Sequence, residues 1–224
     1  MRGRRFSAAL LMGAGLMLAP LGQAHGDEPR PDTAVRLSTD QGDVVIGIFA
    51  RKAPASSEAF LAEAKSGNYD GGGFFRTVRQ GNDNSEPNIE VVQAGVSEAA
   101  GAKDRAPIAH EDTGRTGLRH VDGAVSLPRA AIGTTTAASF FVSIGDQPAL
   151  DFGGKRNPDG QGFAVFGRVI CGMDVVRKIH GLSAEGESPS PVMKGQMLTH
   201  PVVIKSMRVV DPTCTDNAAA PDRD

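Results

Sequence analysis

The sequence predicts a mainly β protein, in which about eight short strands form a closed or nearly closed antiparallel barrel and two helices cover its open ends. Short apolar segments of strand-like composition recur along the chain, whereas only two segments show helical spacing. Glycine is frequent, at 28 of 224 residues, which favours a turn-rich β architecture over a helical bundle. Closure of the sheet would remove its exposed edges.

The eight expected strands are rich in Val, Ile and Phe and cover residues 35–38, 43–49, 74–78, 89–93, 124–127, 140–144, 163–170 and 202–210. The first two flank Asp40-Gln41-Gly42, which has the composition of a hairpin turn. In the strand at 140–144, period 2 places Phe140 and Val142 on a core face. Phe141 then lies on an otherwise polar face, so it either packs under a loop or forms the floor of a groove.

Two segments show the spacing of amphipathic helices. Ser56 or Ser57 can cap the first, which should end at Gly67 and carries apolar residues at helical spacing (Phe60, Leu61 and Ala64). The second begins near residues 173–174 and ends before Gly181, with Val175, Val176 and Ile179 on one face. In a barrel, these helices would close the two open ends.

The first 24 residues have the three parts of a secretory signal peptide. Residues 1–5 are cationic, residues 6–21 are almost entirely apolar, and small residues precede an expected cut after Ala24. An uncleaved membrane anchor is the alternative, but the run is shorter than the roughly 20 residues that span a bilayer. We therefore expect a signal peptide (1–24), a flexible lead (25–32), a folded domain (33–211) and a flexible tail (212–224). The product would be periplasmic or secreted, with no stable membrane insertion after cleavage.

The charge balance excludes nucleic acid as an expected partner. The chain has 24 basic and 26 acidic residues, a formal charge of −2, and phosphate binding needs a basic surface. The five histidines show no metal-ligand spacing, so we expect neither a metal nor a cofactor. Cys171 and Cys214 would either form a structural disulfide in an oxidising compartment or remain two free thiols.

Several segments, taken in order, resemble the cyclophilin-type peptidyl-prolyl cis-trans isomerases, particularly the secreted bacterial branch. They are FFRTV at 74–78, VVQAG at 91–95, GLRHVDGAVSL at 117–127, SFFV at 139–142, LD at 150–151 and FAVFGRV at 163–169. Their order and spacing follow the family from about residue 35 to 210. The resemblance implies an eight-stranded antiparallel cyclophilin-like barrel capped by two α-helices.

The resemblance also implies a site. Arg76 matches the catalytic arginine, whose guanidinium would donate to the prolyl nitrogen as the amide leaves planarity, and Gln93 matches the glutamine that positions it. Phe141 matches the floor of the proline pocket. Neighbouring substrate-binding positions are Val91, Leu150, Phe163, Ser139 and Arg129. Without the motif, Arg76 would be read as a surface arginine, and Val91 and Leu150 as ordinary core residues.

Some residues depart from the family pattern. Phe75 stands where a histidine is usual, and Ser139 stands where a substrate-contacting glutamine is common. Residues 79–88 form a polar insertion, and the pocket phenylalanine that the family has nearby has no clear counterpart. Pro128 lies on the strand whose backbone normally binds the peptide in the family, and proline has no N–H. We therefore expect that Pro128 could displace Arg129.

The sequence therefore predicts a monomeric peptidyl-prolyl cis-trans isomerase that acts on Xaa-Pro bonds and assists the folding of exported proteins. Its partners would be proline-containing segments of unfolded or exported proteins. The alternative is a catalytically weak or silent module on the same fold, which binds proline peptides or acts as a chaperone. Loss of isomerase activity on replacing Arg76 would separate the two.

Overall fold

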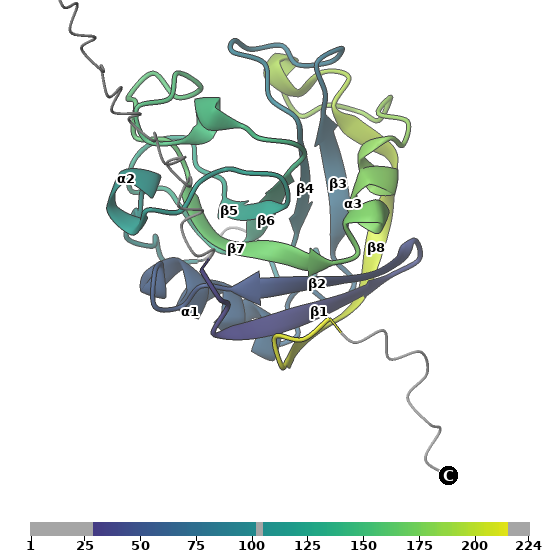
Figure 1. The fold of residues 1–224 in the computed structure, drawn as a ribbon. Coiled ribbons are helices and arrows are strands. Elements are labelled where there is room, and N and C mark those ends of the chain that lie inside the picture. The colour runs from purple at the N-terminus through teal and green to yellow at the C-terminus, as the bar shows by residue number, and fades with distance from the viewer. Residues whose placement is uncertain (1–28, 102–104, 215–224) are drawn as a thin grey trace, which may run out of the picture.

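The computed structural model describes residues 29–101 and 105–214, whose strands form the predicted closed antiparallel barrel (Figure 1). The strands are β1 (Thr33–Thr39), β2 (Gly42–Ile48), β3 (Gly73–Val78), β4 (Val91–Gly95), β5 (Ala124–Leu127), β6 (Ser139–Ser143), β7 (Ala164–Cys171) and β8 (Met197–Val210). Around the barrel they follow the order β1-β2-β7-β5-β6-β4-β3-β8, with β8 returning to β1. Closure leaves every one of these strands with a partner on both sides.

The alternation along the strands separates two apolar clusters, as the sequence predicts. Phe140 and Val142 lie inside the barrel, where Phe140 contacts Phe60 at 5.4 Å and Phe74 at 6.1 Å between ring centroids. Phe141 points to the other side of β6 and belongs to a second, smaller cluster. The first cluster is the core of the barrel, and the second lies beneath the groove described below.

Two helices close the barrel and bury their apolar faces in its core: α1 (Pro54–Lys65) and α3 (Met173–His180). The expected cap of α1 is wrong, because the helix begins at Pro54 and Ser56 lies inside it. Glu111 supplies the cap instead, since its carboxylate accepts from the backbone N–H of Ala55 at 3.0 Å and of Ser56 at 2.8 Å. A carboxylate at this end also interacts favourably with the helix dipole.

The sequence analysis did not predict several short elements. They are the single helical turn α2 (Thr113–Thr116) and the 3₁₀ turns η1 (Pro148–Leu150) and η2 (Pro191–Met193). Strand β8 also begins five residues before the expected position 202, and Ile89 precedes β4 rather than beginning it. These short pieces and strand ends have too few residues to show a periodicity.

Both ends of the described chain are tied to the barrel. Asp32, the last residue of the predicted lead, donates its N–H to the Ile48 carbonyl at 2.8 Å and pairs with Arg51. Cys171 and Cys214 form a disulfide, with their Cα atoms 5.7 Å apart. The predicted signal peptide lies outside the described residues. Within the part of the chain that the structure describes, we find no helix with the length and apolarity to cross a bilayer.

Candidate active site

A groove of about 580 Å³ opens on the side of the barrel formed by β3, β4 and β6. Its lining combines apolar side chains with three arginines: Arg76, Ser85, Ile89, Val91, Gln93, Pro128, Arg129, Ala130, Thr134, Phe141, Leu150, Arg156, Asn157, Phe163, Val192 and Met193. Seven of the eight predicted catalytic and substrate-binding residues line this groove, and the eighth, Ser139, contacts it through Gln93.

The floor of the groove is the second apolar cluster. Phe141 and Phe163 pack edge to face with their ring centroids 5.5 Å apart, and Leu150 is completely buried beside them. Ile89 joins this cluster although the sequence analysis did not select it. Its buried side chain adds to the apolar surface of the groove.

Arg76 extends from β3 to the edge of this apolar floor. Its Nη1 donates to Oε1 of Gln93 at 3.1 Å, and its Nε and Nη2 donate to Oε1 of Gln196 at 3.0 and 2.6 Å. Burial lowers the pKa of Arg76, as does the nearby charge of Arg156, while Asp83 partly offsets both. The guanidinium nevertheless stays protonated at neutral pH. None of the described carboxylates lies within ion-pair distance of Arg76, so its charge is held only by neutral amides.

Gln93 lies opposite Arg76 in the β3–β4 register and opposite Phe141 in the β4–β6 register. It therefore joins the arginine to the apolar floor. Its Nε2 donates to Oγ of Ser139, at the longer distance of 3.4 Å. Ser139 thus orients the glutamine that contacts Arg76.

Arg129 remains in the groove although Pro128 precedes it. Pro128 lies just after the end of β5, so no ladder hydrogen bond of that strand is lost. The Arg129 guanidinium lies 5.7 Å from the Phe163 ring centroid and forms two hydrogen bonds with Asp159, at 2.7 and 2.8 Å. Arg129 therefore lines the groove, with its guanidinium held by Asp159.

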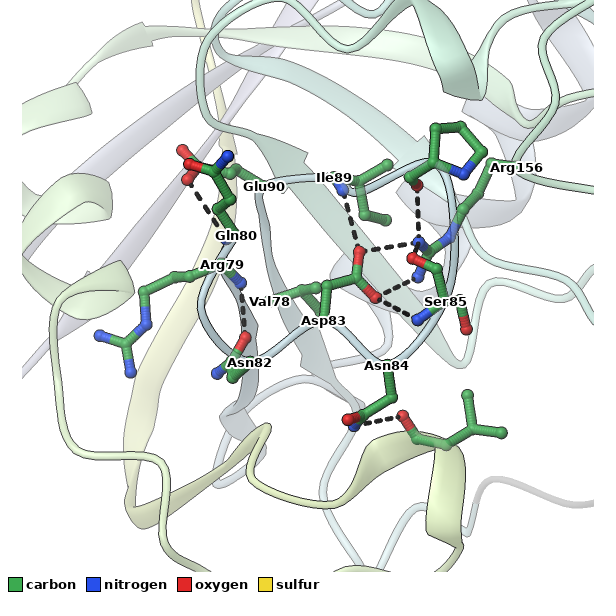
Figure 2. A network of polar contacts seen from close by, with 12 residues as sticks. Val78, Arg79, Gln80, Asn82, Asp83, Asn84, Ser85, Ile89, Glu90 and Arg156 are labelled. Carbon is green, nitrogen blue, oxygen red and sulfur yellow. Dashed lines mark hydrogen bonds and ion pairs between the residues drawn. The ribbon is translucent and has the colours of Figure 1, made fainter.

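The polar insertion is a folded wall of the groove, organised around Asp83 (Figure 2). The Asp83 carboxylate has no exposed surface and accepts from Nη1 and Nη2 of Arg156 at 2.7 and 2.8 Å. It also accepts from the backbone N–H of Ser85 and of Ile89. Arg156 in turn donates to the carbonyls of Ser85 and Pro87, both at 2.9 Å. This network fixes Ile89 against the floor.

A buried polar chain lies beneath Phe141. The imidazole of His120 stacks on Phe141 with 5.9 Å between centroids, and its Nε2 lies 2.9 Å from Oγ of Ser126. Its Nδ1 lies 2.8 Å from Oδ1 of Asp151. Burial lowers the pKa of His120, and Asp151 partly offsets this effect. Ser126 has no exposed surface, so this Ser-His-Asp chain supports the floor and does not act on substrate.

A second hollow, of about 590 Å³, lies between residues 29–31 and strands β5 and β7. It contains none of the predicted site residues. Across residues 29–101 and 105–214, no three His, Cys, Asp or Glu side chains gather as possible metal ligands. Of these two hollows among the described residues, the groove is the candidate site, because it combines an apolar floor with the amide-held arginine.

Comparison with known proteins identifies the family. The family profile "Cyclophilin type peptidyl-prolyl cis-trans isomerase/CLD" matches residues 34–209. The chain belongs to this family. The cyclophilin-type assignment and its isomerase activity, expected from the motifs, are thereby confirmed.

Two bacterial relatives and one solved structure agree with the assignment. A peptidyl-prolyl cis-trans isomerase of Streptomyces antibioticus is 32% identical over 183 residues, covering 80% of this chain and 99% of the relative. Peptidyl-prolyl cis-trans isomerase B of Escherichia coli is 33% identical over 178 residues, covering 78% and 98%. A Cryptosporidium parvum cyclophilin structure shares the fold, with a TM-score of 0.58 at 18% identity, and covers 80% of this chain and 98% of its own.

Proposed function

We propose that this cyclophilin isomerises Xaa-Pro bonds in the groove around Arg76, and that its substrates are proline-containing segments of exported proteins. The observation that carries the proposal is the guanidinium of Arg76, held by two amide oxygens at the edge of the Phe141 floor. The floor would receive the proline ring. A related cyclophilin of Cryptosporidium parvum has also been crystallised in the presence of the dipeptide Ala-Pro.

The chemistry follows from the barrier to rotation. Resonance makes the prolyl amide resist twisting, with a barrier of about 18–20 kcal/mol. When the bond twists, the nitrogen becomes pyramidal and its lone pair localises. The hydrogen bonds to Gln93 and Gln196 engage three of the five N–H groups of Arg76, which leaves donors for that lone pair. A donor that binds the twisted amide better than the planar one lowers the barrier.

Replacing Arg76 tests this function. We expect Arg76→Ala to lower kcat/KM for a short Xaa-Pro peptide by about 10²–10³, the typical contribution of one preorganised donor. Arg76→Lys keeps a charge but loses the planar fork, so most of the loss should remain. Unfolding midpoints of both variants control for damage to the fold. An inactive wild type that still binds proline peptides would instead favour the silent binding module.

The proposed compartment is the periplasm or the extracellular space. Its support is the signal-peptide pattern of residues 1–24 and the Cys171–Cys214 disulfide, a bond that persists in oxidising compartments. Expression in a Gram-negative host should give a periplasmic protein whose N-terminal sequence begins at His25. Recovery of the uncleaved chain from the cytoplasm would contradict this localisation.

A further inference from the structure

Gln196 approaches Arg76 from a distant part of the chain and is held there by the sheet. It lies 120 positions after Arg76, immediately before β8, and has no exposed surface. Its backbone carbonyl accepts from the N–H of Thr77 at 2.8 Å, and the next residue, Met197, is paired with Arg76 in the β3–β8 register. The main chain therefore fixes Gln196 beside the base of the arginine side chain.

The environment of Gln196 allows only one orientation of its amide. Oε1 accepts from both Nε and Nη2 of Arg76, whereas Nε2 donates to the backbone carbonyl of Asn82 at 2.9 Å. A rotated amide would bring an NH₂ group against the guanidinium N–H groups and a carbonyl against a carbonyl. Asn82 is fixed in turn, because its Nδ2 donates to the carbonyl of Gly195 at 2.8 Å. The insertion and the arginine are thus linked through one glutamine.

This contact aims the guanidinium without neutralising it. A single oxygen that bridges Nε and Nη2 fixes the plane of the guanidinium, and Gln93 holds Nη1 at the other side. A carboxylate could make the same hydrogen bonds but would cancel the charge. Gln196 does not line the groove, so it has no contact with a substrate bound there. Any effect on catalysis must pass through Arg76.

We propose that Gln196 is a positioning residue of the isomerase, which fixes the orientation of Arg76 and connects it to the insertion at residues 79–88. The proposal rests on the proposed catalytic role of Arg76. The orientation of the guanidinium matters for the rate, because a misplacement of about 1 Å can reduce a rate by about 10². In this proposal the insertion has two roles: it forms a wall of the groove, and it contributes to catalysis through the contact of Asn82 with Gln196.

Gln196→Met provides the direct test, because it keeps the length of the side chain and removes the acceptor. We expect kcat/KM to fall about tenfold or more, within the 10² that misplacement can cost, and kcat to change more than KM. Exchange of the Arg76 Nε–H with water, followed by NMR, should accelerate. Gln41→Met is the matched control, since Gln41 lies in the β1–β2 turn and does not line the groove.

Gln196→Glu adds a readout that damage to the fold would not produce. When protonated, the glutamic acid can replace the glutamine, accepting from Arg76 and donating to Asn82. When ionised, it repels the Asn82 carbonyl and neutralises the arginine. Activity should therefore fall as pH rises through the titration of the new carboxyl group, a limb that wild type lacks.

The outcomes separate the two proposals. If Arg76→Ala is inactive while Gln196→Met keeps wild-type kcat/KM and slow Nε–H exchange, the positioning role is overturned and the proposed function stands. If Arg76→Ala is as active as wild type, the proposed function fails and the positioning role with it. Should Gln196→Met not fold, the pH profile of Gln196→Glu decides, and a profile like that of wild type overturns the positioning role.

Discussion

Arg76 and Arg156 line the same groove but are held in opposite ways. Arg156 is neutralised by the buried carboxylate of Asp83 and donates its remaining hydrogen bonds to backbone carbonyls. Among the described residues, the Arg76 guanidinium donates hydrogen bonds only to the neutral amides of Gln93 and Gln196. The difference teaches that charge in this groove depends on the partner more than on the residue type, because a carboxylate cancels the cation whereas an amide only orients it.

The cost of burying a charge bears on how each arginine is held. A buried cation needs a counterion, since an unpaired one costs several kcal/mol. Arg156 has a side chain that is 9% exposed and acts as a structural clamp. Arg76 is also partly buried, and burial lowers its pKa. Its two amide acceptors orient the guanidinium without cancelling the charge, which then remains available to a substrate. Three predictions test this comparison, and another concerns the buried histidine beneath the groove.

The largest effect should come from breaking the clamp. Asp83→Ala leaves Arg156 buried without its counterion, so we expect the free energy of unfolding to fall by about 3–5 kcal/mol in urea titrations. The double variant Asp83→Leu/Arg156→Met removes both charges and should lose less than the single variant. A loss for Asp83→Ala as small as that of a surface ion pair would show that the two arginines are not held differently.

The second prediction gives Arg76 a carboxylate partner, as Arg156 has. Gln93→Glu places a carboxylate beside Arg76, and its charge should cancel part of the guanidinium field. We expect kcat/KM to fall by up to about 10², or ~2.7 kcal/mol, with little change in the unfolding midpoint. Gln41→Glu adds the same charge in the β1–β2 turn and should leave kcat/KM unchanged. Full activity of Gln93→Glu would mean that neutralisation of Arg76 has no consequence.

The third prediction concerns His120, which burial keeps neutral beneath Phe141. Because burial lowers the folded pKa of His120 from its usual value of 6.5, the unfolded chain binds a proton first as pH falls. The contribution of His120 to the free energy of unfolding should therefore be fully present above about pH 6.5. It should decrease as pH falls towards the folded pKa. Urea unfolding at pH 7.5 and pH 5 should show this decrease, and His120→Gln should reduce it. The same change at the exposed His200 should not.

The smallest effect is expected at Asp159, the partner of Arg129. The Asp159 side chain is 38% exposed, whereas that of Arg129 has no exposed surface, so solvent screens the pair from one side only. Asparagine keeps an acceptor oxygen for Arg129, so Asp159→Asn should lower the unfolding midpoint at pH 7 less than Asp83→Ala does. Hydrogen bonds from Arg129 and from the Gln161 N–H lower the pKa of Asp159 to about 2. Its contribution should therefore be present above pH 3.8 and be lost only as pH falls towards 2. Destabilisation equal to that of Asp83→Ala would place Arg129 with Arg156 as a structural clamp.

The sequence predicted the barrel, its two closing helices and the separation of Phe140 from Phe141. The resemblance to the family also selected seven of the residues that line the groove. The separation of Phe140 from Phe141 could be predicted because alternation along a strand is a local property, which can be recognised within five or six residues. The helix cap failed for the opposite reason, since Glu111 reaches the N-terminus of α1 from 55 positions away.

What the sequence by itself determined is the alternation that places Phe140 inside the barrel and Phe141 on the opposite side of its strand. Only the tertiary structure decided which side chain binds each arginine. Gln196 is 120 positions from Arg76 along the sequence, and Asp83 is 73 positions from Arg156. Nothing in the neighbourhood of these residues along the chain marks them as partners. Barrel closure brings β8 against β3 and the insertion against residues 148–157, and only then can an amide or a carboxylate be assigned to each guanidinium.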